Sequence, residues 1–191
     1  MPDWMTAQVR DHGRAAEAFE GRIDDVRKVA QVFQTAFADG KTLWTFGNGG
    51  SAADAQHFTG ELVGHYRHDR RPLPAVTLSC DPTSMTCIAN DYAYDDVFSR
   101  QVAALARPGD VVAAFTTSGR SPNVVTGLAA AKANGATTVL FGGGDGGPAA
   151  QHADHLLLSP STVTPRIQEM HTLMLHLISE HLDNWAAGVE P

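Results

Sequence analysis

The 191-residue sequence has little cysteine, no long apolar run and fewer basic than acidic side chains. Its two cysteines, Cys80 and Cys87, are too few for a disulfide framework or a four-cysteine zinc site, and no apolar segment typical of a secretion signal follows Met1. No run approaches the roughly 20 apolar residues that span a bilayer. We therefore expect a protein of the reducing cytoplasm with no membrane partner, in which both cysteines are small buried side chains.

The charge composition narrows the possible partners. The chain has 14 Lys and Arg residues against 21 Asp and Glu residues, a formal net charge of −7. Nucleic-acid binding needs a basic face that displaces counterions, so we expect no nucleic-acid partner. An anionic substrate is compatible with this charge if its site is local and built from amides and hydroxyls.

Short β-prone runs alternate with helical segments along the chain. Apolar residues recur at helical spacing over Ala15–Phe37, and a long terminal helix is predicted over Arg166–Trp185. The predicted strands are 42–47, 74–78, 110–115, 137–141 and 155–158. Two more helices are predicted over 51–66 and 123–134. This alternation predicts an α/β fold of three layers, a doubly wound parallel sheet with helices on both faces. We expect one domain over 1–191, with an N-terminal helical segment to about 40, a core over about 41–160 and a C-terminal helix over about 165–185.

Two loops after predicted strands have the composition of anion sites. Gly47-Asn-Gly-Gly-Ser51 ends a strand with close-approaching glycines and a serine that is a good helix cap, so the N–H groups of the next helix would face a phosphate. The same pattern also describes an ordinary junction between a strand and a helix. Thr116-Thr-Ser-Gly-Arg-Ser121 follows another strand with four hydroxyls, without the Gly-Lys-Ser/Thr of a P-loop or a full Gly-x-Gly-x-x-Gly. Together the loops favour a sugar phosphate over a nucleotide.

Two predicted helices present groups that can move protons or bind a metal. His57 and Glu61 are four residues apart and share one helix face, as do Gln168, Thr172 and His176 on the terminal helix. Two donors from each helix would suit a four-ligand zinc site, and they would equally supply a carboxylate base and an imidazole acid. The alternatives without a catalytic or metal-binding role are that His57 and Glu61 form an ordinary solvated pair and that His176 is a histidine of the apolar core.

The motifs occur in an order that resembles the phosphoheptose isomerases of the sugar isomerase (SIS) family. The resemblance runs over nearly the whole chain through segments 47–51, 54–58, 61–64, 89–91, 116–119 and 166–171. It implies a flavodoxin-like SIS domain whose long terminal helices serve in oligomerisation, a homotetramer with active sites between subunits, and zinc in some members. It also implies isomerisation of sedoheptulose 7-phosphate to D-glycero-D-manno-heptose 7-phosphate through an enediolate.

The resemblance assigns roles to individual positions. Glu61 would be the base and His176 the acid, while His57, Glu61, Gln168 and His176 would hold zinc. The residues implied in substrate binding are Asn48, Gly49, Gly50, Ser51, Asn90, Asp91, Thr116, Thr117, Ser118, Ser121 and Gln168. A carboxylate bound firmly to zinc is a poorer free base, so the two roles of Glu61 compete.

Some positions depart from the family pattern. His65 stands where many relatives have arginine, Arg120 replaces a common asparagine, and Pro165 stands where a small or acidic residue is frequent. Arg120 has two readings, a charge near the phosphate or a solvated side chain. The main alternative function is a non-catalytic SIS-domain binding protein resembling the replication-initiator-associating protein, but that protein lacks the counterparts of Glu61 and His176. A sugar-phosphate sensor for transcription would need a DNA-binding extension, which this sequence does not show.

Overall fold

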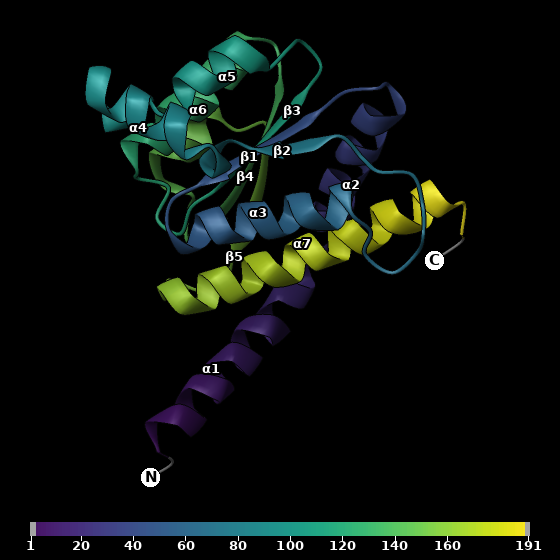
Figure 1. The fold of residues 1–191 in the computed structure, drawn as a ribbon. Helices are drawn as coiled ribbons and strands as arrows, with labels where there is room; N and C mark the ends of the chain where they lie inside the picture. The colour runs from purple at the N-terminus through teal and green to yellow at the C-terminus, as the bar shows by residue number, and fades with distance from the viewer. Residues whose placement is uncertain (1–2, 190–191) are drawn as a thin grey trace.

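The computed structural model describes residues 3–189, which form a twisted parallel sheet between two layers of helices (Figure 1). The strands are β1 (Leu43–Gly47), β2 (Ala75–Thr77), β3 (Val111–Phe115), β4 (Thr137–Gly143) and β5 (His155–Ser159). Their order in the sheet is β2-β1-β3-β4-β5, and every neighbouring pair is parallel. This is the flavodoxin-like order, so the predicted doubly wound α/β fold is confirmed.

The chain reverses its direction of travel across the sheet at β1. From β1 it first moves to the edge strand β2, then returns to the other side of β1 as β3, so Gly47 and Phe115 become partners in adjacent strands. In sheets of this kind ligands bind beyond the carboxyl ends of the strands where the order reverses. The two predicted anion loops follow these two strand ends directly.

The helices divide between the two faces of the sheet, and each face has its own apolar core. The α-helices of the structure are α1 (Trp4–Phe19), α2 (Ile23–Ala38), α3 (Gly50–Val63), α4 (Pro82–Asp91), α5 (Ser99–Leu105), α6 (Pro122–Ala133) and α7 (Thr164–Ala187). Helices α2, α3 and α7 bury their apolar stripes on one face, whereas α5 and α6 cover the other. Pro165 in the first turn of α7 and left-handed Gly188 after its end explain where this helix begins and stops.

The α3–α7 pair carries most of the predicted chemistry, and its two helices run parallel. Near their N-terminal ends Gly50 lies against the side chain of Gln168, and near their C-terminal ends the N–H of Tyr66 meets the carboxylate of Asp183. Residues at corresponding heights along the two helices therefore face each other.

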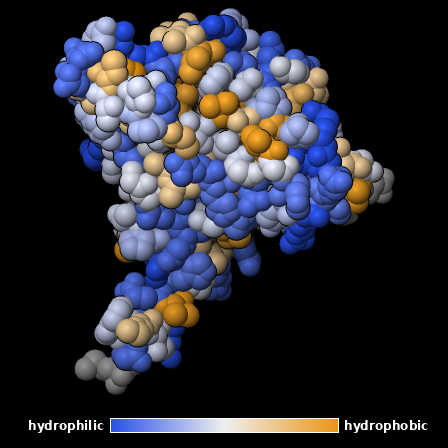
Figure 2. Space-filling view, in the orientation of Figure 1, coloured by the Kyte–Doolittle hydropathy of each residue, from blue (hydrophilic) through white to orange (hydrophobic). Residues whose placement is uncertain are grey.

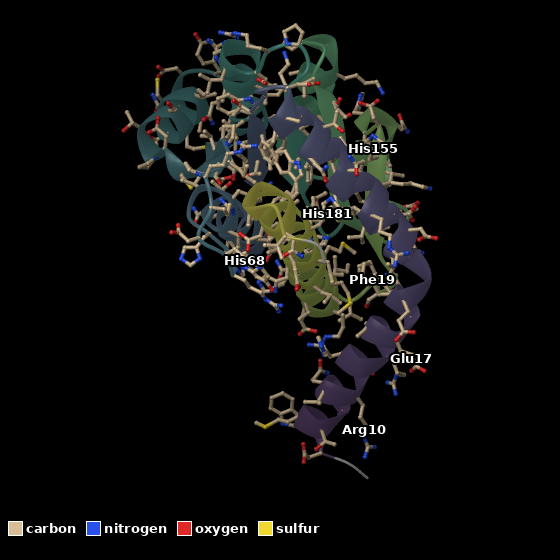
Figure 3. All side chains as sticks on the ribbon, turned by 90° about the vertical axis from the view of Figure 1, so that its right-hand side faces the viewer. Arg10, Glu17, Phe19, His68, His155 and His181 are labelled. Atoms are coloured by element: carbon tan, nitrogen blue, oxygen red, sulfur yellow. The ribbon has the colours of Figure 1, made fainter. Side chains whose placement is uncertain are left out.

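The first predicted helix is wrong in its extent and continuity. Instead of one helix over Ala15–Phe37, α1 ends at Phe19 and α2 starts at Ile23, with a short 3-10 turn over Glu20–Arg22 between them. Phe19 is buried at the joint, while α1 projects from the body as an arm along which Arg10 and Glu17 lie (Figure 3). The space-filling view shows the same arm standing clear of the body (Figure 2).

Other expectations about this chain have mixed outcomes. The predicted strands are all present within one or two residues, although the helix after the first glycine loop ends at Val63 rather than at Tyr66. Cys80 and Cys87 are exposed, which corrects the expectation that they are buried. Within residues 3–189, no helix combines the length and apolar character needed to cross a membrane.

Candidate active site

A small polar pocket of about 150 Å³ lies where the sheet order reverses. It is lined by Asn48, Ser51, Phe115, Thr116, Thr117, Ser118 and Ser121. Six of these seven were predicted as substrate-binding residues, and the fold brings them together from two loops far apart in the sequence. We call this the hydroxyl pocket.

The first loop of the hydroxyl pocket depends on glycine at two positions. A Cβ on Gly47 would lie 2.6 Å from the carbonyl oxygen of Ser51 and 2.9 Å from that of Phe115, so only glycine permits this tight passage. Gly49 is the N-terminal cap of α3 with a φ of 57°, which favours glycine. Ser51 is not the cap that the sequence predicted, because it lies inside the first turn of α3. In this first turn the N–H of Ser51 donates to the carbonyl oxygen of Asn48 at 3.1 Å and that of Ala52 to Gly49 at 3.0 Å, so the helix end attracts an anion through its dipole and the Ser51 hydroxyl.

The second loop rests on the glycine cluster after β4. Gly119 has a φ of 63°, and a Cβ there would come within 1.8 Å of the carbonyl oxygen of Gly146. The hydroxyl of Thr116 accepts the N–H of Gly119 at 3.1 Å, and the hydroxyl of Ser118 accepts the N–H of Arg120 at 3.2 Å. Each hydroxyl keeps its own hydrogen, so both shape the loop and remain able to donate to a ligand.

Three of the predicted substrate contacts are arranged differently from the rest. The amide of Asn48 is engaged within the protein, because it donates to Asn123 at 2.8 Å and accepts from Asn123 at 2.9 Å and from the hydroxyl of Tyr94 at 3.1 Å. Asn90 and Asp91 are exposed at the end of α4, where the amide of Asn90 donates to Asp91 at 2.8 Å. Neither lines the hydroxyl pocket. Asn123, which is buried beside Asn48, was missed by the sequence analysis.

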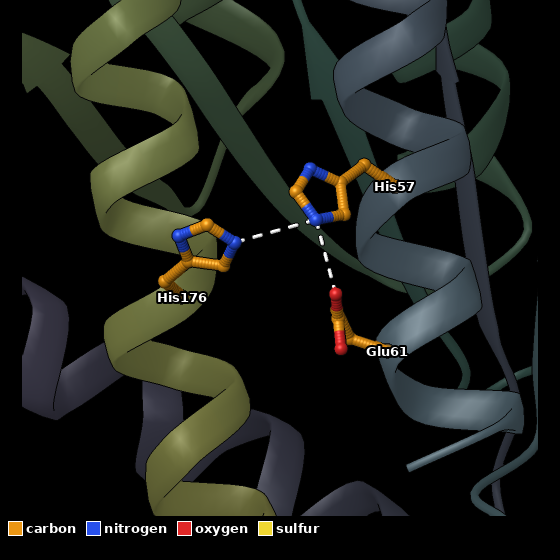
Figure 4. A group of neighbouring side chains, drawn as sticks. All are labelled: His57, Glu61 and His176. Atoms are coloured by element: carbon orange, nitrogen blue, oxygen red, sulfur yellow. Dashed lines mark hydrogen bonds and ion pairs between the residues drawn. The ribbon is translucent and has the colours of Figure 1, made fainter. Parts of the chain in front are cut away.

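His57, Glu61 and His176 form one compact group (Figure 4). The Nε2 atom of His57 lies 3.0 Å from Oε1 of Glu61 and 3.3 Å from Nε2 of His176, and the three side chains point into the same space from α3 and α7. All three come from one chain. The two rings meet edge to face, with centroids 4.9 Å apart.

The protonation of His176 follows from its surroundings. Partial burial lowers the pKa of His176 below its ordinary value of 6.5, the nearby His57 lowers it further, and the charge of Glu61 opposes both effects. His176 is therefore mainly neutral at pH 7. A neutral imidazole has one nitrogen that can accept a proton or bind a metal, and one N–H that can donate.

The donor set of this group fits a zinc ion. Around a tetrahedral zinc with ligands at about 2.0–2.1 Å, neighbouring ligand atoms are about 3.3 Å apart. The ligand atoms of His57, Glu61 and His176 all lie within 4.8 Å of one another, with two separations of 3.0 and 3.3 Å. The fourth predicted ligand, Gln168, lies two helical turns before His176, and its amide approaches Gly50 at the start of α3. Three of the four predicted ligands are thus gathered, while Gln168 stands nearer the hydroxyl pocket.

The hydroxyl pocket and the His57–Glu61–His176 group are joined by α3. Ser51 lines the pocket, and His57 and Glu61 follow it by six and ten residues, which is about 9 and 15 Å along the helix. An anion held at the first turn would therefore extend along α3 toward the imidazoles and the carboxylate.

Two buried contacts behind this site carry no signal in the sequence pattern. The ring of His171 is fully buried, with Nε2 3.2 Å from the carbonyl oxygen of Gly142 and Nδ1 3.8 Å from the carboxylate of Asp54. Arg70 and Asp183 form a buried ion pair at 2.9 Å between the loop after α3 and helix α7. Neither pair was expected, because its members are far apart in the sequence.

Comparison with known proteins is consistent with this arrangement. Residues 10–143 match the SIS domain family. A phosphoheptose isomerase of Paramagnetospirillum magneticum is 43% identical over 185 residues, covering 96% of both chains, and one of Aquifex aeolicus is 49% identical over 152 residues, covering 80% of both. The structure of a phosphoheptose isomerase from Neisseria gonorrhoeae superposes with a TM-score of 0.89 at 36% identity, covering 94% of this chain and 97% of that one. On these similarities, the chain belongs to the phosphoheptose isomerase family of SIS-domain proteins.

Proposed function

We propose that the protein is an aldose–ketose isomerase that converts D-sedoheptulose 7-phosphate to D-glycero-D-manno-heptose 7-phosphate. The observation that carries the proposal is the placement of a carboxylate and two imidazoles on the same helix pair as a hydroxyl-lined pocket at its N-terminal end. Relatives named phosphoheptose isomerases support both the reaction class and the seven-carbon substrate.

In this proposal the hydroxyl pocket holds the phosphate. The hydroxyls of Ser51 and Ser121 donate hydrogen bonds to the phosphate, and the dipole at the N-terminal end of α3 adds a partial positive charge. Such a site binds an anion without lysine or arginine, which agrees with the acidic composition of the chain. Gln168, whose amide lies against Gly50 at the start of α3, is suited to a hydroxyl of the sugar.

The chemistry is assigned to Glu61 and His176. Glu61 removes a proton from C1 of the ketose, which leaves an enediolate, and returns it to C2 to form the aldose. His176 donates its N–H proton to the oxygen on C2. The proton of the C1 hydroxyl then moves to His176, which returns the imidazole to its neutral form. A neutral imidazole suits this role, because it polarises the carbonyl and stabilises the developing charge without needing to be cationic.

We propose zinc as the resident metal, held by His57, Glu61 and His176, with Gln168 as the fourth donor once its amide moves away from Gly50 toward the imidazoles. When bound, the ion would supply Lewis-acid stabilisation to the oxygens of the substrate. A metal-bound Glu61 is a weaker base, so its two roles are separable by measuring proton transfer with and without metal. Zinc content should fall in His57→Ala and Gln168→Ala, and unchanged stoichiometry would remove those residues from the ligand set.

We propose that the protein works in the cytoplasm as a homotetramer with active sites between subunits. Support comes from α1, whose projecting arm carries exposed Trp4, Met5 and Val9. Exposed apolar side chains on an isolated arm are typical of surfaces covered by a second copy. Light scattering should give about four chains per particle, and a monomer would contradict this part of the proposal.

Direct observation of the reaction tests the proposed function. Purified protein is mixed with sedoheptulose 7-phosphate, and the anomeric proton of the aldose product is followed by NMR, with added zinc and with chelator. Unphosphorylated sedoheptulose serves as the matched control, because it lacks the group that the hydroxyl pocket binds. No aldose phosphate in the presence of zinc would refute the proposal.

A further inference from the structure

Arg70 and Asp183 make a charged pair that is removed from solvent. Their side chains are 0% and 1% exposed, and Nε of Arg70 lies 2.9 Å from Oδ1 of Asp183. Burying two charges carries a large desolvation penalty, which is offset only when both are paired and hydrogen-bonded. Because a buried ion pair often stabilises a fold no more than apolar residues would, its role is inferred from the other hydrogen bonds that Arg70 and Asp183 make.

Asp183 organises the loop that follows α3. Its carboxylate accepts the N–H groups of Tyr66 at 3.3 Å, Arg67 at 2.9 Å and His68 at 2.8 Å. Burial alone would raise the pKa of Asp183, but these N–H groups and Arg70 outweigh it and lower the pKa. The carboxylate therefore stays ionised and holds three consecutive peptide groups against α7.

Arg70 caps the last turn of α3. It donates to the carbonyl oxygens of Glu61 and Leu62, both at 2.7 Å, and to that of Gly64 at 3.2 Å. Carbonyls in the last turn of a helix lack intrahelical partners, and a cation there is favoured by the helix dipole. The guanidinium thus fixes the backbone of Glu61 itself and ties it to Asp183.

The same pair reaches the other side of the proposed reaction centre. Asp183 lies seven residues after His176 and hence on the same face of α7. The ring of Tyr66, whose N–H binds Asp183, lies 5.7 Å from the ring of His176. We propose that Arg70 and Asp183 are positioning residues that set the separation of Glu61 and His176. The inference rests on the proposed function for its kinetic consequence, but the geometry that it predicts does not depend on turnover.

Arg70→Lys is the sharpest perturbation. Lysine keeps the charge but has no planar fork, so it cannot bind Asp183 and the α3 carbonyls together. We expect kcat to fall about tenfold to a hundredfold, the loss typical of an ångström-scale misplacement of catalytic groups. KM and the inhibition constant of inorganic phosphate should stay within about twofold, because the hydroxyl pocket lies at the opposite end of α3.

The matched control is a second ion pair between the loop after α3 and helix α7. Arg67 and Glu180 form an ion pair at 2.7 Å whose side chains are 60% and 38% exposed. Arg67→Met and Glu180→Gln should leave kcat and KM near the wild-type values, since exposed pairs contribute little. If Arg70→Lys folds poorly, the double variant R70M/D183L removes both charges without leaving one buried and unpaired, and the same loss of kcat is expected.

A second readout is independent of activity. Histidine ring resonances of the metal-free protein are compared between wild type, Arg70→Lys and Arg67→Met, with His176 assigned by its substitution. The inference predicts that the His176 ring signals move in Arg70→Lys and not in the control. The positioning role is overturned if folded Arg70→Lys and R70M/D183L keep kcat within about twofold of wild type. It is also overturned if KM and the phosphate inhibition constant rise in step with the kcat loss, or if the His176 signals are unchanged. An inactive wild type with shifted His176 signals would refute the proposed function alone.

Discussion

Glu61→Gln separates proton transfer from binding at the proposed reaction centre. Glutamine has nearly the size and shape of glutamate, and its amide can still face Nε2 of His57, which lies 3.0 Å from the carboxylate in the wild type. What is lost is the negative charge and the capacity to take a proton. Because the charge of Glu61 raises the pKa of His176, the substitution also lowers that pKa further and keeps His176 neutral.

The size of the effect follows from the role of the carboxylate. General-base catalysis contributes roughly 10²- to 10⁴-fold, so kcat should fall by at least about 100-fold, or about 3 kcal/mol of transition-state stabilisation. KM should change by less than about threefold, since Ser51 in the first turn of α3 lies about 15 Å along the helix from Glu61.

Deuterium exchange makes this test specific to the proton-transfer step. In D₂O, wild-type enzyme should incorporate deuterium from solvent into substrate and product, because the abstracted proton exchanges on the base. Glu61→Gln should lose exchange and turnover together, with zinc content measured in the same samples. Glu180→Gln, a carboxylate change in the solvent-exposed ion pair with Arg67, serves as the matched control and should behave as wild type.

Three results would contradict the assignment of Glu61 as the base. Near-normal turnover in Glu61→Gln would require another base. Loss of turnover with normal deuterium exchange would mean that another group abstracts the proton and that Glu61 acts later or through the metal. Loss of turnover that is restored by excess zinc would assign Glu61 to metal binding alone.

Three further predictions concern the pocket, its support and pH. Ser121→Ala should weaken inhibition by inorganic phosphate about tenfold or more, since a hydrogen bond to a charged group contributes about 1.5–3 kcal/mol, whereas unchanged inhibition would remove Ser121 from the phosphate site. Gly119→Ala should lower the free energy of unfolding by about 2–4 kcal/mol in denaturant melts, and clearly more than Gly144→Ala, because both glycines have similar positive φ values (63° and 61°) but only Gly119 would place its Cβ against another backbone. Since the pKa of His176 is lowered, kcat/KM should be constant near neutrality and fall on acidification with an inflection below 6.5, and an inflection above 6.5 would contradict a neutral His176.

Much of the fold is predictable because each strand carries a local signal. Every residue of β3, Val111–Phe115, is buried, and such short apolar runs between helical segments are typical of parallel sheets. The break between α1 and α2 has no such signal. Phe19, Ile23 and Val26 continue the helical spacing across it, and Gly21 disfavours a helix by only about 1 kcal/mol, so periodicity predicts one helix where the chain forms two.

The candidate site is predictable where its parts are local in sequence. Glycines and hydroxyls identify the two loops, and the spacing of His57 and Glu61 places them on one face. Their meeting with His176 is different, because it depends on α7 packing parallel to α3 across 119 residues of sequence. Apolar periodicity shows that each helix is buried, but it does not show which helix is its neighbour. The buried pair of Arg70 and Asp183 is invisible for the same reason.

Helix α3 connects the first glycine loop at its N-terminal end with the His57–Glu61–His176 group near its C-terminal end. A helix is a rigid rod, so fixing both of its ends fixes everything between them. The N-terminal end is set by Gly47, whose lack of a Cβ allows close contact with Phe115 of β3, and the C-terminal end is set by Arg70. Glu61 then stands at a defined distance from any phosphate bound at the first turn. A substrate with a shorter carbon chain between its phosphate and its carbonyl would not reach the hydroxyl pocket and Glu61 at once. We therefore expect kcat/KM to fall as the sugar phosphate is shortened. Equal kcat/KM values for five- and seven-carbon ketose phosphates would show that α3 does not set this distance.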